Sequence, residues 1–215
     1  MGDISHLIGY LFHLDKHLTQ IVHDFGSWTY LFLFLIIFIE TGLVAMPFLP
    51  GDSLLFIVGT FAAMGSLDMS TVLMILVIAA VSGDSVNYAI GKFLGPKVFF
   101  KKQSRFFKKE YLERAERFYA RYGAKAIVLG RFIPIIRTFV PFVAGIGSMD
   151  YRKFLFYNIL GGTLWVGGFV SAGYFFGNMP VVKNNFSLVI MMIIFLSILP
   201  GVLEVWRNRL GEKST

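Results

Sequence analysis

The sequence predicts an all-α integral membrane protein, an inverted repeat of two re-entrant helical hairpins that are each followed by a transmembrane helix. Three observations support this prediction. Of the 215 residues, 56% are hydrophobic and 24 are Phe. Only 15% are charged, against about 25% in a soluble domain. Two apolar stretches nevertheless contain prolines, glycines and full charges. Charged residues are costly at membrane depth, and they are typical of a substrate or ion path.

Two stretches are apolar and long enough to cross a bilayer, which takes about 20 residues. They are residues 70–91 and 154–177, and a last transmembrane helix is expected over 186–206. Near the N-terminus, apolar residues recur at helical spacing over 4–25 with polar residues between them, which predicts an amphipathic helix in the interface. The first residues carry no positively charged stretch, so we expect no cleaved signal peptide.

The two broken segments are each expected to enter and leave the membrane on the same side. Within residues 28–66, the apolar runs 28–39 and 53–65 are both too short to span, which favours a re-entrant hairpin. One span over 28–46 is the alternative. A second hairpin is predicted over 124–148. The residues that break the helices are Pro47, Pro50, Gly51, Pro134, Pro141 and Gly145.

Basic residues predict the orientation of the chain. More than half of its 20 Lys and Arg residues lie within residues 92–125, where 97–122 is expected to form a basic amphipathic helix. By the positive-inside rule this segment and the C-terminus face the cytoplasm. Arg152 and Lys153 then lie on the same side only if residues 124–148 form a hairpin. The net charge of +7 therefore indicates a contact with anionic lipid, and no nucleic-acid partner is expected.

Short sequence matches indicate an internal repeat. The matched ranges are 65–68 with 147–150, 91–95 with 173–177, and 47–51 with 141–145. The first two pairs are 82 residues apart and the third pair is 94 apart. Because the predicted topology sends the two spans in opposite directions, the repeats are expected to be inverted. Inverted repeats with broken helices are typical of secondary transporters, whose site lies between the repeats.

Four charged residues in the hairpins are the main candidates for a functional site. Arg131 and Arg137 present planar, permanently charged guanidinium groups that suit a lipid phosphate headgroup. Glu40, in an apolar helix, is a candidate for proton exchange and gating, and so is Asp52. Structural roles are the alternative: the arginines could pair with these carboxylates, and Asp52 could cap the helix that follows it.

Further polar residues lie in the predicted spans and could support the site. Asp84, Asn87 and Tyr88 share one helical face of the first span, and Asn158 lies in the second. Asp84 is a candidate for relaying a proton or anchoring an arginine, whereas all four could simply bond neighbouring helices.

Other classes of site are not expected. The chain has no Cys, and its closely spaced pair, His13 and His17, lacks a third ligand, so neither a metal nor another cofactor is predicted. No His follows residue 23 to act as the nucleophile of a lipid phosphatase, and no enzymatic activity is predicted.

Several of these motifs occur together in one known family. They are Glu40-Thr-Gly, Pro47-Phe-Leu-Pro50-Gly51-Asp52-Ser53, Gly83-Asp84 with Asn87-Tyr88, Gly130-Arg131-Phe-Ile-Pro134, and Tyr151-Arg-Lys-Phe154 with Asn158 and Trp165. In this combination, over residues 1–206, the chain resembles the DedA family of bacterial inner-membrane proteins, which is related to the VTT (SNARE-associated Golgi protein) group of lipid scramblases. The resemblance implies that Glu40, Asp52, Arg131 and Arg137 are essential.

The resemblance also implies proton-motive-force-dependent transport, a role in envelope integrity and recycling of undecaprenyl phosphate. We therefore expect a transporter that flips undecaprenyl phosphate or a phospholipid across the bacterial inner membrane, with this anionic lipid and the bilayer as its partners. The alternative is a proton-coupled antiporter of small solutes or drugs. A homo-oligomer is compatible with either function.

Overall fold

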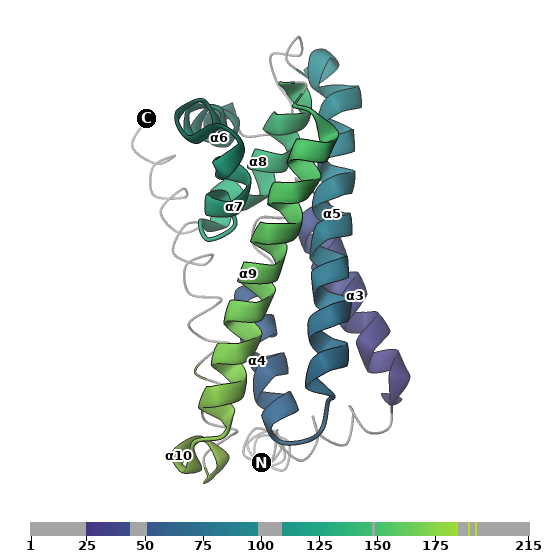
Figure 1. The fold of residues 1–215 in the computed structure, drawn as a ribbon, viewed down its shortest axis with the longest axis vertical. Coiled ribbons are helices and arrows are strands. Elements are labelled where there is room, and N and C mark those ends of the chain that lie inside the picture. Colours follow the sequence, from purple (N-terminus) through teal and green to yellow (C-terminus); the bar gives the residue numbers. More distant parts are fainter. Residues whose placement is uncertain are drawn as a thin grey trace, which may run out of the picture. The chain divides into compact units, whose positions relative to one another are not determined.

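The computed structural model describes residues 25–43, 51–98, 109–147 and 149–184, together with residues 189 and 192. Every regular element in these ranges is a helix (Figure 1), which agrees with the predicted all-α class. The expected interfacial helix over 4–25 and the expected last span over 186–206 fall almost entirely outside the described residues.

Two of the helices coincide with the predicted spans. Met69–Phe93 and Tyr151–Gly177 are long and apolar enough to cross a membrane, and they contain the stretches predicted over 70–91 and 154–177. The remaining helices are shorter. In chain order the elements are α3 (Ser27–Gly42), α4 (Gly51–Ala63), α5 (Met69–Val98), α6 (Lys109–Tyr122), the 3-10 turn η1 (Gly123–Lys125), α7 (Ala126–Gly130), α8 (Pro134–Ile146), α9 (Tyr151–Gly177) and α10 (Pro180–Asn184).

Each predicted hairpin corresponds to a pair of short helices. In the first, α3 has 16 residues and α4 has 13, so α3 is about 24 Å long, less than the roughly 30 Å hydrocarbon core. In the second, α7 and α8 flank a turn at Arg131–Ile133, directly before Pro134. Pro141 and Gly145, which were predicted to break the helix, instead lie inside α8, which continues to Ile146. The short lengths agree with the hairpin interpretation, while the re-entrant path and the inverted orientation stay predictions. Residues 44–50, which include Pro47 and Pro50, lie outside the described part.

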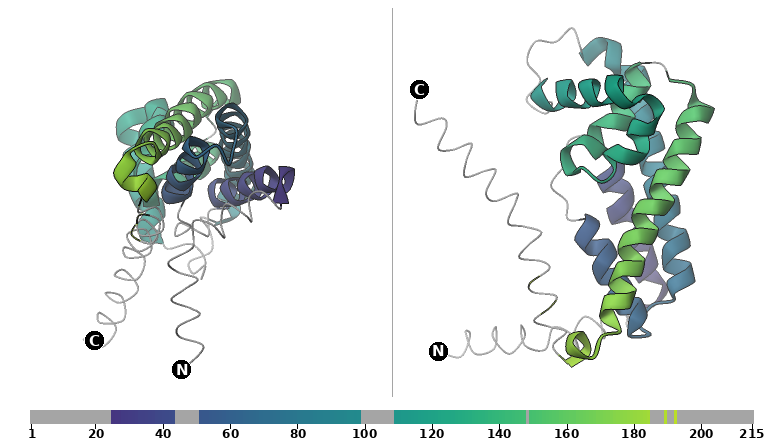
Figure 2. Two further views of the ribbon diagram at one scale, coloured as in Figure 1. Left: turned by 90° about the horizontal axis from the view of Figure 1, so that it is seen from below. Right: turned by 60° about the vertical axis from the view of Figure 1, so that its left-hand side comes forward.

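The described helices belong to two compact units. The larger unit contains the described parts of 30–49 and 70–168, and the smaller unit contains 25–29, 51–69 and 169–184. In the larger unit, α5 runs beside the first part of α9, and α6 and α7 lie next to α8 (Figures 1 and 2). In the smaller unit, α4 packs against the last turns of α9.

The core of the larger unit joins α8 to its neighbours. Its buried members are Tyr88, Ala115, Ala126, Ile127, Phe139, Val140, Phe142, Val143, Ala144, Met149 and Phe154. Helix α6 contributes Ala115 to this core and exposes Arg114, Arg117 and Arg121. The predicted basic amphipathic helix over 97–122 therefore forms over Lys109–Tyr122, and residues 99–108 lie outside the described part.

Glycines allow the short helix α8 to approach the long helix α5 closely in the larger unit. A Cβ atom on Gly91 of α5 would lie 2.2 Å from the carbonyl oxygen of Phe142. A Cβ atom on Gly145 of α8 would lie 2.2 Å from the carbonyl oxygen of Tyr88. Both distances are far below van der Waals contact, so only glycine permits this α5–α8 contact.

The smaller unit contains the same pair of contacts between α4 and α9. A Cβ atom on Gly173 would lie 2.0 Å from the carbonyl oxygen of Phe56, and one on Gly59 would lie 2.1 Å from that of Val170. Equivalent residues are 82 apart on the long helices and 86 apart on the short helices. This pattern supports the predicted repeat. This offset of 86 replaces the offset of 94 for the hairpins, because the sequence match aligned Gly145 with Gly51, whereas the glycine of α4 that packs in the same way is Gly59.

Substitution of these glycines tests the close contacts. We expect Gly173→Ala to destabilise the protein by about 1–3 kcal/mol, because the added methyl group overlaps the carbonyl of Phe56. Gly168→Ala in the same helix is the matched control, since a Cβ atom there has no atom within 4 Å and alanine favours helix by up to about 1 kcal/mol. Thermal unfolding in detergent measures both variants, and equal melting temperatures would contradict the packing described.

Candidate functional site

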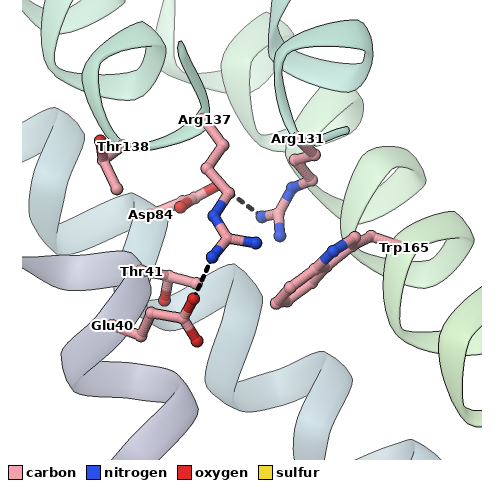
Figure 3. Close-up of a pocket in the computed structure, with 7 residues that line it drawn as sticks. All are labelled: Glu40, Thr41, Asp84, Arg131, Arg137, Thr138 and Trp165. Atoms are coloured by element: carbon pink, nitrogen blue, oxygen red, sulfur yellow. Dashed lines mark hydrogen bonds and ion pairs between the residues drawn. The ribbon is translucent and has the colours of Figure 1, made fainter. Parts of the chain in front are cut away.

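A small buried pocket in the larger unit brings together residues from α3, α5, α8, α9 and the α7–α8 turn (Figure 3). Its lining residues are Glu40, Thr41, Asp84, Arg131, Arg137, Thr138 and Trp165. The cavity open to a water-sized molecule is about 10 Å³, which is room for about one water molecule. The pocket is therefore narrow, because its charged side chains fill most of it.

The helix break before α8 directs both arginines into this pocket. Pro134 is the first residue of α8, and Ile133 before it is extended, with φ −117° and ψ 108°, as is usual for a residue that precedes proline. The chain turns from Arg131 to Ile133, whose N–H donates to the carbonyl oxygen of Gly130 at 3.0 Å. Arg131 thus projects from the turn and Arg137 from the start of α8.

Arg131 is held by acceptors from two helices. Its Nη2 forms an ion pair with the carboxylate of Asp84, and it donates to Asn158 Oδ1 at 2.5 Å and to the carbonyl oxygen of Ala80 at 3.3 Å. Asn158 also donates to the carbonyl oxygen of Val81 at 2.9 Å. The Arg131 side chain is only 4% exposed. Of the two roles considered for Asp84, the geometry matches the anchoring of an arginine.

Two glycines of α9 make room for Arg131. A Cβ atom on Gly161 would lie 3.2 Å from its Cδ, and one on Gly162 would lie 3.7 Å from its Cζ. The Nε of Arg131 is buried, and in the described part of the chain it has no hydrogen-bond partner. Arg131 therefore reaches Asp84 past these two glycines, and a side chain at Gly161 would crowd its Cδ.

Arg137 forms the second ion pair of the pocket, with Glu40 (Figure 3). Glu40 is 1% exposed and lies in the last turn of α3. The helix dipole disfavours a negative charge at this end of a helix, so the guanidinium group of Arg137 compensates both for the dipole and for burial. At 9% exposure, the Arg137 side chain is the less buried of the two arginines.

Trp165 forms a wall that both arginines share. Its ring centroid lies 5.8 Å from the Cζ of Arg131 and 5.4 Å from the Cζ of Arg137. A desolvated cation–π contact contributes about 2 kcal/mol, so this ring stabilises two guanidinium groups that would otherwise repel each other. Sequence analysis gave Trp165 no role at the site beyond its place in the family motif.

The structure also shows where the other predicted residues lie. Asp52 lies in the first turn of α4, in the smaller unit, where the helix dipole favours an acidic group; its gating role stays a prediction. The hydroxyl of Tyr88 donates to the carbonyl oxygen of Met149, and its ring stacks on Phe154 at 4.5 Å. Tyr88 thus supports the start of α9 rather than lining the pocket.

Besides Trp165, two lining residues were missed by sequence reasoning. Thr41 and Thr138 directly follow Glu40 and Arg137 in the chain, and that adjacency was the only available signal. In the described part of the chain, no three Asp, Glu or His side chains gather as a metal ion would require. The pocket is thus an arrangement of two cations and two anions in which an incoming anion could take the place of a carboxylate.

Comparisons with known proteins agree on one family. The VTT domain model matches residues 49–175. The chain is 50% identical over 211 residues to Protein DedA of Escherichia coli (strain K12), covering 97% of this chain and 96% of that protein. It is 42% identical over 180 residues to an uncharacterized membrane protein of Mycobacterium leprae, with 84% and 81% covered. Inner membrane protein YqjA of Escherichia coli (strain K12) is 30% identical over 191 residues, with 86% and 87% covered. No solved structure matches the chain.

Removal of one partner from the Arg131 ion pair should destabilise the protein strongly. We expect Asp84→Asn to lower stability by about 3–5 kcal/mol, because it leaves a buried guanidinium group without its counter-ion. The double variant Asp84→Leu with Arg131→Met should be more stable than Asp84→Asn, because it buries no charge. Thermal unfolding in detergent measures these differences.

The exposed pair Glu113–Arg117 of α6, with 3.8 Å between its charged atoms, provides the matched control. Glu113→Gln should change stability by less than about 1 kcal/mol, since solvent screens this pair. A loss at Asp84 no larger than the loss at Glu113 would show that the Arg131 pair is not buried as described.

Proposed function

The chain belongs to the VTT domain family, and we propose that it moves a lipid with a phosphate headgroup, undecaprenyl phosphate or a phospholipid, across the bacterial inner membrane. The two long apolar helices and the names of its relatives support a membrane protein. The proposal is transport of an unchanged lipid, with no chemical step. Two buried arginines inside the larger unit support this choice over other cargoes.

The observation that carries the proposal is that two buried arginines share one pocket while their counter-ions come from different helices. Asp84 of α5 balances Arg131, and Glu40 of α3 balances Arg137. A guanidinium group binds a phosphate in the same forked geometry in which it binds a carboxylate. A phosphate can therefore replace a carboxylate as acceptor, and the four charges sum to zero while the pocket is empty.

We propose that the Arg137–Glu40 pair is the pair that opens. Arg131 is tied to acceptors on both α5 and α9, so its release would disturb two long helices. Arg137 pairs with a short helix instead, and its side chain is the more exposed of the two. Because the cavity has room for only about one water molecule, a phosphate can enter only if side chains move apart.

Opening of this pair would couple the lipid to a proton. Glu40 is buried, and a buried carboxylate is costly unless it is paired with a cation or protonated. When a phosphate takes Arg137, uptake of a proton by Glu40 removes the uncompensated charge. Proton uptake and phosphate binding then favour each other, which gives a physical basis for drive by the proton motive force.

The hydrocarbon tail need not enter the pocket. Large apolar side chains are exposed on α5 and α9, among them Met74 and Phe156, and the bilayer is a suitable environment for them. The headgroup would then cross along the polar site while the tail stays in lipid.

Reconstitution in liposomes with labelled undecaprenyl phosphate tests this function. We expect Arg137→Gln to slow flipping about 10- to 100-fold, since it removes charge-assisted hydrogen bonds of about 1.5–3 kcal/mol to the phosphate. Arg117→Gln on the exposed face of α6 is the control and should flip at the wild-type rate.

The same assay contains the outcomes that would contradict the proposal. Wild-type flipping in Arg137→Gln would remove this arginine from the phosphate site. Movement of a soluble cation down a pH gradient, with no movement of lipid, would instead support the proton-coupled antiporter.

A further inference from the structure

Asn87 binds both segments that carry the Arg137–Glu40 ion pair. It lies on α5 with 0% exposure. Its amide nitrogen Nδ2 donates to the carbonyl oxygen of Thr41 at 3.2 Å and to that of Thr138 at 2.7 Å. Thr41 directly follows Glu40, and Thr138 directly follows Arg137.

We propose that Asn87 is a positioning residue that fixes α3 relative to α8 and thereby holds Glu40 against Arg137. One planar amide group supplies both donors, so the two carbonyl oxygens are held at a defined separation. Both acceptors are backbone atoms, which means that Asn87 positions the helices themselves. Each residue of the ion pair directly precedes, in its helix, the residue whose carbonyl oxygen Asn87 binds.

Both bonded segments lack some of the usual helical hydrogen bonds. Thr41 lies in the last turn of α3, where backbone carbonyls have no partner within the helix. In α8, Pro141 has no N–H to donate to the carbonyl of Arg137, four residues earlier, whereas Asn87 binds the carbonyl of the next residue, Thr138. An external donor is therefore worth more at Thr41 than beside an intact helix.

Glycines on the same face of α5 place Asn87 between the two helices. Gly83, Asn87 and Gly91 recur every four residues and so lie in one row. A Cβ atom on Gly83 would lie 1.9 Å from the hydroxyl oxygen of Thr41, and one on Gly91 would lie 2.2 Å from the carbonyl oxygen of Phe142. Gly83 thus brings α3 close, Gly91 brings α8 close, and the amide between them bonds to both.

A mutant cycle in the full-length protein tests this role without any ligand. Melting temperatures in detergent are measured for Glu40→Gln, Arg137→Gln and the double variant, first in the wild-type background and then with Asn87→Leu. In the wild-type background, the changes in melting temperature caused by Glu40→Gln and Arg137→Gln should be strongly non-additive, because the two residues contact each other. Asn87→Leu has a similar volume but no donors, and we expect it to reduce the non-additive part by about half or more.

Tyr88→Phe is the matched control background. It also removes one buried hydrogen bond from α5, to the carbonyl of Met149, but this bond reaches neither α3 nor α8. The non-additivity should therefore stay at its wild-type value. The same non-additivity with Asn87→Leu as in the wild type would overturn the proposal. If Asn87→Leu does not fold, Asn87→Gln, which displaces the donors by one methylene group, serves in the same cycle under the same criterion.

The consequence for transport rests on the proposed function and is measured separately. The assay uses liposomes with labelled undecaprenyl phosphate. In Asn87→Leu the Arg137–Glu40 pair should open without proton uptake. The flipping rate with a pH gradient, divided by the rate without one, should therefore be lower than in the wild type. An unchanged ratio would contradict this link. If the wild-type protein does not flip the lipid at all, the proposed function fails, whereas the mutant cycle still decides the role of Asn87.

Discussion

The pairing of two buried arginines with two buried carboxylates is the interaction on which the larger unit depends. Each charge taken from water costs several kcal/mol, and only a close counter-ion with further hydrogen bonds recovers that cost. Asp84 of α5 and Glu40 of α3 are those counter-ions, and Trp165 of α9 lies against both guanidinium groups. The helices must meet at this pocket, because a charge separated from its counter-ion would be left buried among them.

The two ion pairs are alike in composition and different in their surroundings. Arg131 sits in a recess formed by glycines of α9 and shares its Nη2 with Asp84, Asn158 and a backbone carbonyl. The Arg137 pair instead joins two short helices, and Asn87 holds the residues next to it. Under the proposed function, one arginine stays fixed while the other changes partners, and such a site is suited to binding and then releasing an anion.

Much of this arrangement could be predicted, because a charge in an apolar segment is conspicuous. Glu40, Arg131 and Arg137 were found in that way. Both long helices could be predicted from the length and apolar composition of their sequence stretches. The pairing itself could not be deduced, since the rotation of each helix about its axis decides whether Arg131 meets Asp84 or another acid. Trp165 and the threonines carry no charge, and such residues occur throughout membrane helices, so composition did not distinguish them.

The internal repeat duplicates the packing of the chain but not its chemistry. With the offset of 82 along the long helices, Asp84 corresponds to Val166 and Asn87 to Phe169. Glycine contacts therefore recur in both units, whereas the polar residues of α5 that anchor Arg131 and bridge α3 to α8 have apolar equivalents in α9.

With the offset of 86 along the short helices, Asp52 is equivalent to Thr138, the residue beside Arg137. Both short helices thus carry a charge at the same turn, basic in α8 and acidic in α4. This correspondence supports a role for Asp52 beyond the stabilisation of the first turn of α4 by an acidic group.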